Sequence, residues 1–135
     1  MEDPFLLSSI VVKRLTEEWI EHGGLIIAYD FDNTVFDFHN KGYTFDGVIR
    51  LLRQCEELGC KFICFTARSK DNYKEVEDHI LENNIPCDGI NIDILDFGDV
   101  RKPYYNILLD DRAGLRSSMQ DLESAYCTIK QIKEI

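Results

Sequence analysis

The stretch Leu25-Ile26-Ile27-Ala28-Tyr29 is a short apolar run, and Asp30-Phe31-Asp32 follows it at once. An apolar run without polar alternation is typical of a strand that is buried on both faces of a sheet. Gly23-Gly24 precede the run and end an amphipathic helical pattern over 6–22. The stretch therefore predicts an inner strand of a parallel sheet with carboxylates at its carboxyl end.

The alternation of strand and helix patterns continues along the chain. Further strands are expected at 61–65, 90–95 and 106–109, and further helices at 46–58, 70–83 and about 117–133. This order predicts an α/β fold: a doubly wound, Rossmann-like parallel sheet of four or five strands with helices on both faces. Ligands of such sheets bind at the carboxyl ends of the strands.

The length and composition narrow the class of protein. The 135 residues suit one domain, and no apolar run approaches the roughly 20 residues of a membrane span. A formal net charge of -10 argues against a broad role in binding nucleic acid. Five cysteines without a Cys-x-x-Cys pair fit a reducing cytoplasm better than a disulfide framework.

Acidic and hydroxyl side chains follow three of the four predicted strands. Asp30 and Asp32 follow the first strand, Thr66 the second, and Asp110-Asp111 the last. Residues two apart in extended backbone point to the same side, so Asp30 and Asp32 can reach one pocket. Clustered carboxylates raise one another's pKa or hold a cation between them, and Mg²⁺ accepts such oxygen ligands together with a phosphate. For the first pair alone, ordinary turn and capping roles explain the acids equally well.

Thr66 and Lys102 suit a phosphoryl group. A hydroxyl and nearby backbone amides can hold phosphate oxygens, and an ammonium offsets their charge. A carboxylate can attack phosphorus to give an aspartyl-phosphate, which water then hydrolyses. A second carboxylate can protonate the leaving oxygen and later activate the water.

The order of these residues resembles the four motifs of the haloacid dehalogenase-like phosphatases. Asp30-Phe-Asp-Asn-Thr34 is similar to the first motif (D-x-D-x-T) and Phe65-Thr66-Ala67-Arg68 to the second. Lys102-Pro103 is similar to the third motif and Leu108-Leu109-Asp110-Asp111 to the fourth. The resemblance covers about residues 25–116. It implies one domain over 1–135, with 25–135 as the catalytic core and 1–24 as an N-terminal helical extension.

The resemblance also implies a Mg²⁺-dependent phosphomonoester hydrolase. In it, Asp30 is the nucleophile and Asp32 the general acid and base. Asp30, the backbone carbonyl of Asp32, and Asp110 hold the Mg²⁺. Asp111 acts on the metal through water or orients Lys102.

Thr66 and Lys102 are expected by the same resemblance to bind the substrate phosphate, with Ala67 and Arg68 as further candidates. Asp110 comes eight positions after Lys102, so the usual helix between the third and fourth motifs must be almost absent. If Lys102 does not reach the pocket, the next candidates for the cation are Arg68, Lys70 and Arg112.

The substrate is less closely defined. The segment 36–45, called the flap below, is too short for a cap domain, so the site is either open or closed by a neighbour in a homo-oligomer. His39 and the aromatic residues of the flap could meet substrate or could simply pack. The acidic surface favours a small phosphorylated metabolite or nucleotide over a polyanion.

The alternative to a phosphatase is a signalling or non-catalytic phosphate-binding module. The order of the motifs, however, differs from that of response-regulator receivers.

Overall fold

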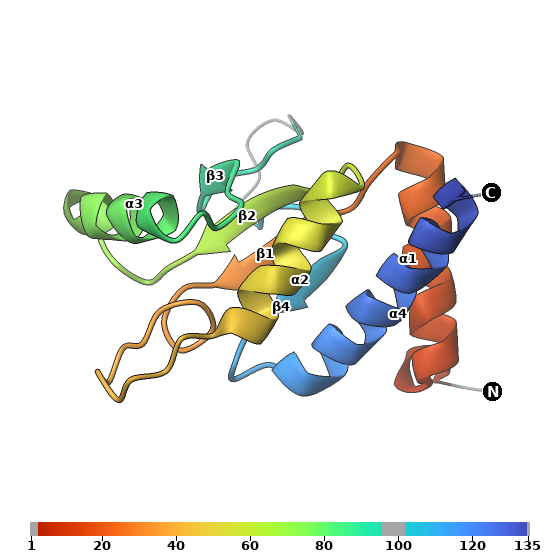
Figure 1. The fold of residues 1–135 in the computed structure, drawn as a ribbon, viewed down its shortest axis with the longest axis horizontal. Coiled ribbons are helices and arrows are strands. Elements are labelled where there is room, and N and C mark those ends of the chain that lie inside the picture. Colours follow the sequence, from red (N-terminus) through yellow and green to blue (C-terminus); the bar gives the residue numbers. More distant parts are fainter. Residues whose placement is uncertain (1–2, 96–101, 135) are drawn as a thin grey trace.

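The computed structural model describes residues 3–95 and 102–134. The elements in chain order are η1 (Pro4–Leu6), α1 (Ser8–His22), β1 (Ile26–Asp30), α2 (Asp46–Glu57), β2 (Lys61–Phe65), η2 (Lys70–Asn72), α3 (Tyr73–Glu82), β3 (Gly89–Ile90), β4 (Ile107–Leu109) and α4 (Leu115–Glu134). Figure 1 shows α1 beside α4 at one end of the molecule and α2 lying against the sheet. None of the described helices has both the length and the apolar character that crossing a membrane requires.

The sheet has four parallel strands in the order β3-β2-β1-β4. Strands lie on both sides of β1, with β2 and β3 on one side and β4 on the other, which confirms the predicted α/β, Rossmann-like fold. The register pairs Asp30 of β1 with Phe65 of β2 and Tyr29 of β1 with Leu109 of β4. The residues that directly follow β2 and β4, Thr66 and Asp110, therefore lie at the same edge of the sheet as Asp30.

The two faces of the sheet are covered differently. All four α-helices bury apolar side chains in one large cluster, which includes Ile27 and Tyr29 of β1. The opposite face carries a smaller cluster of Ile26, Ala28 and Ile63. The side chains that pack against this smaller cluster are partly buried and come from strands and connecting segments: Phe65, Ile94, Tyr105 and Leu108.

The prediction placed helices on both faces, whereas no described helix contributes to the smaller cluster. The physical reason is that connecting segments cover this face. Ile94 and Tyr105, from the described parts of the connection between β3 and β4 (91–95 and 102–106), pack against the smaller cluster, and these parts contain no helix.

The strand expected at 90–95 is only the two-residue β3. Asn91 has a positive φ of 54°, which turns the chain out of the extended conformation directly after Ile90. Ile94 then packs against the second face of the sheet instead of continuing the strand. The alternation of apolar and polar residues over 90–95 therefore belongs to a segment that packs on the sheet through Ile94.

The N-terminal segment belongs to the main core. Leu15 and Trp19 of α1 are fully buried, and the Trp19 indole donates a hydrogen bond of 2.9 Å to the carbonyl of Leu58. The predicted division between an extension at 1–24 and a core at 25–135 is therefore not visible in the packing.

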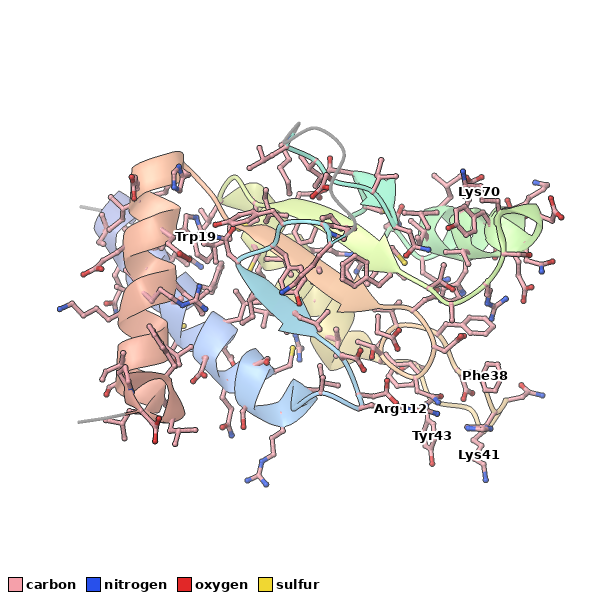
Figure 2. The ribbon with its side chains drawn as sticks, turned by 180° about the vertical axis from the view of Figure 1, so that it is seen from behind. Trp19, Phe38, Lys41, Tyr43, Lys70 and Arg112 are labelled. Atoms are coloured by element: carbon pink, nitrogen blue, oxygen red, sulfur yellow. The ribbon has the colours of Figure 1, made fainter. Side chains whose placement is uncertain are left out.

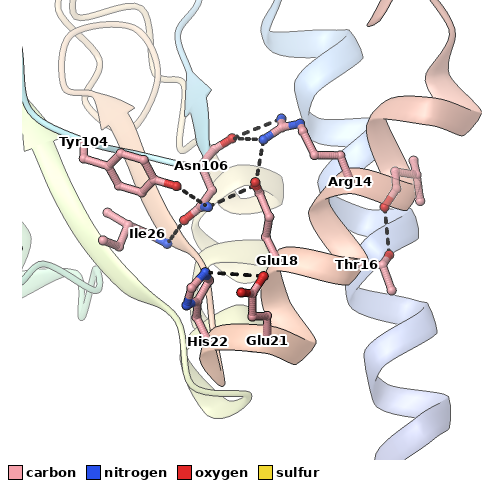
Figure 3. Close-up of polar contacts among 9 residues, drawn as sticks. Arg14, Thr16, Glu18, Glu21, His22, Ile26, Tyr104 and Asn106 are labelled. Carbon is pink, nitrogen blue, oxygen red and sulfur yellow. Dashed lines mark hydrogen bonds and ion pairs between the residues drawn. The ribbon is translucent and has the colours of Figure 1, made fainter. Parts of the chain in front are cut away.

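Asn106, which is buried, connects α1 to the amino ends of β1 and β4 (Figure 3). Its side-chain oxygen accepts a hydrogen bond from the Ile26 amide at 2.7 Å, and its side-chain amide donates to Glu18 and to the Tyr104 hydroxyl. Arg14 donates to the Asn106 carbonyl and to Glu18. Because these bonds join α1 to two strands, α1 holds the end of the sheet opposite the acidic residues.

Candidate functional site

Three carboxylates meet at the carboxyl ends of the central strands. Asp30 is the last residue of β1, and Asp110 and Asp111 directly follow β4. One ligand atom from each of the three lies within 4.8 Å of the others. Neighbouring parallel strands that end at one edge produce this cluster, as the sequence indicated.

The cluster opens into a cavity of about 370 Å³. The residues that line it come from the end of β1, the turn that follows β1, the flap, and the segments after β2 and β4: Asp30, Asp32, Asn33, Phe38, His39, Ala67, Asp110, Asp111 and Arg112. Of the predicted site residues, the four aspartates and Ala67 reach this cavity. Thr66, Arg68 and Lys102 are not among its described lining residues.

The environment of Asp30 favours its protonated form. Partial burial, followed by the negative charge of Asp110, raises the pKa of Asp30 from 3.8 to about 7. A hydrogen bond with Asp111 and the charges of Asp111 and Asp32 act in the same direction. A cation bound among these oxygens would reverse the effect because it favours the charged carboxylate.

This pKa predicts how the stability of the metal-free protein depends on pH. The folded state binds more protons than the unfolded state between pH 3.8 and about 7, so stability is lost as pH rises through this window. Asp30→Asn removes this titration. Thermal unfolding should therefore show that the variant gains more in Tm over the wild type near pH 8 than near pH 5. An equal difference at both pH values would contradict the raised pKa.

Arg68 holds Asp32 from outside the cavity. Its guanidinium donates to Asp32 at 3.0 Å and pairs with Glu75 of α3 at 2.8 Å. The same group lies 5.3 Å from the ring centroids of both Phe31 and Phe36. These contacts fix the orientation of the Asp32 carboxylate, so the structure gives Arg68 a positioning contact where the sequence suggested phosphate binding.

Thr34 supports the other side of the cluster. Its hydroxyl, fully buried, accepts a hydrogen bond of 3.1 Å from the Asp111 amide and lies 3.4 Å from an Asp111 carboxylate oxygen. Asn33 has a positive φ of 61°, which asparagine tolerates better than most residues. The turn after β1 is thereby tied to the turn after β4.

Asn91 is a supporting residue that the sequence analysis missed. Its side chain accepts from the Thr66 amide at 3.0 Å, donates to the Thr66 carbonyl at 2.8 Å, and donates to the Tyr73 hydroxyl at 2.7 Å. The Thr66 hydroxyl in turn accepts from the Arg68 amide. Asn91 therefore fixes the turn after β2. In the predicted strand 90–95, Asn91 occupies only a polar position of the alternating pattern, and its partners are far away in sequence.

Lys102 lies on the second face of the sheet. Its ammonium is 5.6 Å from the centroid of the Tyr105 ring, and Tyr105 packs edge-on against Phe65 with centroids 5.8 Å apart. Tyr105 and Phe65 both belong to the cover of the smaller apolar cluster. The predicted phosphate-binding cation is therefore held by an aromatic contact and is not among the described residues that line the acid-lined cavity.

Comparison with known proteins supports the fold alone. No protein-family model matches the chain, and no curated protein matches it. The solved structure of a conserved protein from Bacteroides thetaiotaomicron is similar with a TM-score of 0.60 at 21% sequence identity. The similarity covers 80% of this chain and 91% of that one.

Proposed function

We propose that this protein is a Mg²⁺-dependent phosphomonoester hydrolase of the haloacid dehalogenase-like type, without a cap domain. The observation that carries the proposal is the cluster of Asp30, Asp110 and Asp111, whose ligand atoms lie within 4.8 Å of one another in a cavity that Asp32 also lines. The motif order in the sequence supports the same activity. Both observations concern the same edge of the sheet.

The donor set fits Mg²⁺. Carboxylate oxygens are the hard ligands that Mg²⁺ prefers. The pKa of Asp30 is raised by burial and then by the negative charge of Asp110, and a bound cation would balance that charge. Asp30, Asp110 and the backbone carbonyl of Asp32 would hold the ion, with Asp111 acting through water. When bound, Mg²⁺ would neutralise charge on the carboxylates and on the substrate phosphate.

The proposed reaction has two displacements at phosphorus. A carboxylate oxygen of Asp30 bonds to phosphorus while the bond to the leaving oxygen breaks, and Asp32 donates a proton to that oxygen. Asp32 then takes a proton from water, whose oxygen attacks phosphorus and breaks the bond to Asp30. The products are an alcohol and inorganic phosphate, and both aspartates return to their starting states.

The substrate we propose is a small phosphorylated metabolite or nucleotide. The cavity of about 370 Å³ has room for a phosphate and part of its leaving group, and the net charge of -10 disfavours long polyanions. A second copy of the chain could close the site. The compartment we propose is the reducing cytoplasm, because the five cysteines of the sequence include no Cys-x-x-Cys pair.

The test is the initial rate of phosphate release by the purified full chain with Mg²⁺. The panel contains an aryl phosphate, nucleoside monophosphates, sugar phosphates and, as a control, an aryl phosphodiester. We expect hydrolysis of phosphomonoesters and little release from the diester, because a diester lacks the terminal phosphate dianion that the metal and cation would bind. A protein that hydrolyses no member of the panel would contradict the proposal.

A further inference from the structure

The acid-lined cavity needs a positive charge besides the metal. Asp30, Asp32, Asp110 and Asp111 all line it, and a phosphomonoester brings up to two further negative charges. A Mg²⁺ ion balances only part of this charge. A lysine or arginine facing the cavity would complete the balance and bind the phosphate oxygens.

Three of the basic residues considered from the sequence are placed elsewhere. Lys102 lies against Tyr105, outside the cavity lining. Arg68 is held by Asp32 and Glu75. Lys70 belongs to η2 and lies near α3, well apart from Arg112 in Figure 2.

Arg112 is the one lysine or arginine among the described residues that line the cavity. Its backbone amide donates a hydrogen bond of 2.9 Å to an Asp110 carboxylate oxygen, which fixes the start of its side chain beside the acidic cluster. The side chain is exposed and lies at the flap end of the molecule, where Phe38 and Tyr43 are also found (Figure 2). Phe38 and Arg112 thus line the same cavity from the flap and from the turn after β4.

We propose that Arg112 is the substrate-binding cation of this site and holds the phosphate oxygens in place of Lys102. The inference rests on the proposed function for its substrate class. A guanidinium presents paired N–H donors that match two phosphate oxygens, and its long side chain can reach over the cluster from the turn after β4. The turn itself is held by bonds from the backbone, so replacing the side chain leaves them in place.

The experiment measures binding and turnover separately. Inorganic phosphate is titrated by calorimetry into the full chain with Mg²⁺, for the wild type, Arg112→Ala, Arg112→Lys, Lys102→Ala and Arg116→Ala. Arg116 is the matched control because it is an exposed arginine in the first turn of α4 outside the cavity lining. The same proteins are assayed with an aryl phosphate, and their Tm values are compared.

We expect Arg112→Ala to weaken phosphate binding about tenfold or more, and to raise KM by a similar factor with a smaller change in kcat. Arg112→Lys should retain part of the affinity because it keeps the charge but loses the paired donors. Lys102→Ala should lose less than Arg112→Ala, and Arg116→Ala should match the wild type.

Each contrary result has its own meaning. Equal phosphate affinity for Arg112→Ala and Arg116→Ala, or a larger loss for Lys102→Ala, overturns the assignment of Arg112 even when the wild type hydrolyses phosphomonoesters. If phosphate binding depends on Arg112 but no ester is hydrolysed, the result supports Arg112 as the phosphate-binding cation and contradicts the proposed phosphatase activity. A wild type that neither binds phosphate nor hydrolyses esters overturns both.

Discussion

Asp30→Asn should abolish phosphomonoester hydrolysis, with a loss in kcat of about 10⁴-fold or more. The amide is a far weaker nucleophile than the carboxylate, and no other described carboxylate is both at the end of β1 and within the cluster. The rate of phosphate release from an aryl phosphate at saturating substrate measures the loss. Retention of more than a hundredth of the wild-type kcat would contradict the role of Asp30 as nucleophile.

Unfolding would not explain this loss. Asp30→Asn removes a carboxylate whose pKa is raised by burial and by Asp110, so the metal-free variant should be at least as stable as the wild type at neutral pH. Asp71→Asn is a matched control because Asp71 is an exposed aspartate on η2, outside the cavity lining. It should keep wild-type kinetics.

The positions of the carboxylates could be predicted because they depend on local sequence and on a general property of parallel sheets. The apolar run 25–29 specifies an inner strand, and polar residues after neighbouring parallel strands meet at one edge. Asp30, Asp110 and Asp111 therefore lie together although 80 positions separate the first two. The strand predicted at 61–65 also ends at this edge, because Phe65 of β2 pairs with Asp30 of β1.

The partners of the basic residues could not be predicted. A long side chain can contact several neighbours, and many of these come near it only when the chain has folded. The ion pair of Arg68 with Glu75 depends on where α3 begins, and the contact of Lys102 with Tyr105 depends on how Tyr105 packs on the second face. The described residues that cover the second face likewise come from strands and connecting segments and not from a helix. The order of residues in a motif identifies the residue type and its approximate place in the fold. The direction in which a side chain such as that of Lys102 points depends on how it packs.

Removal of divalent metal should reduce hydrolysis by about 10³-fold or more, because charge stabilisation by a metal contributes several kcal/mol in the transition state. Asp110→Asn should cause a loss in the presence of Mg²⁺ as well, since it removes one of three oxygen donors that lie within 4.8 Å of one another. Higher Mg²⁺ concentrations should recover part of that loss if the remaining donors still bind the ion.

The most direct test of the central claim is phosphate release from an aryl phosphate by wild-type protein, first in excess chelator and then with excess Mg²⁺ restored. Asp30→Asn, purified in parallel, is assayed under both conditions to measure any contaminating phosphatase. The account predicts no release above that background in chelator, and full recovery by the wild type alone when Mg²⁺ is added. Full activity of the wild type in chelator, or equal activity of the wild type and Asp30→Asn with Mg²⁺, would contradict it.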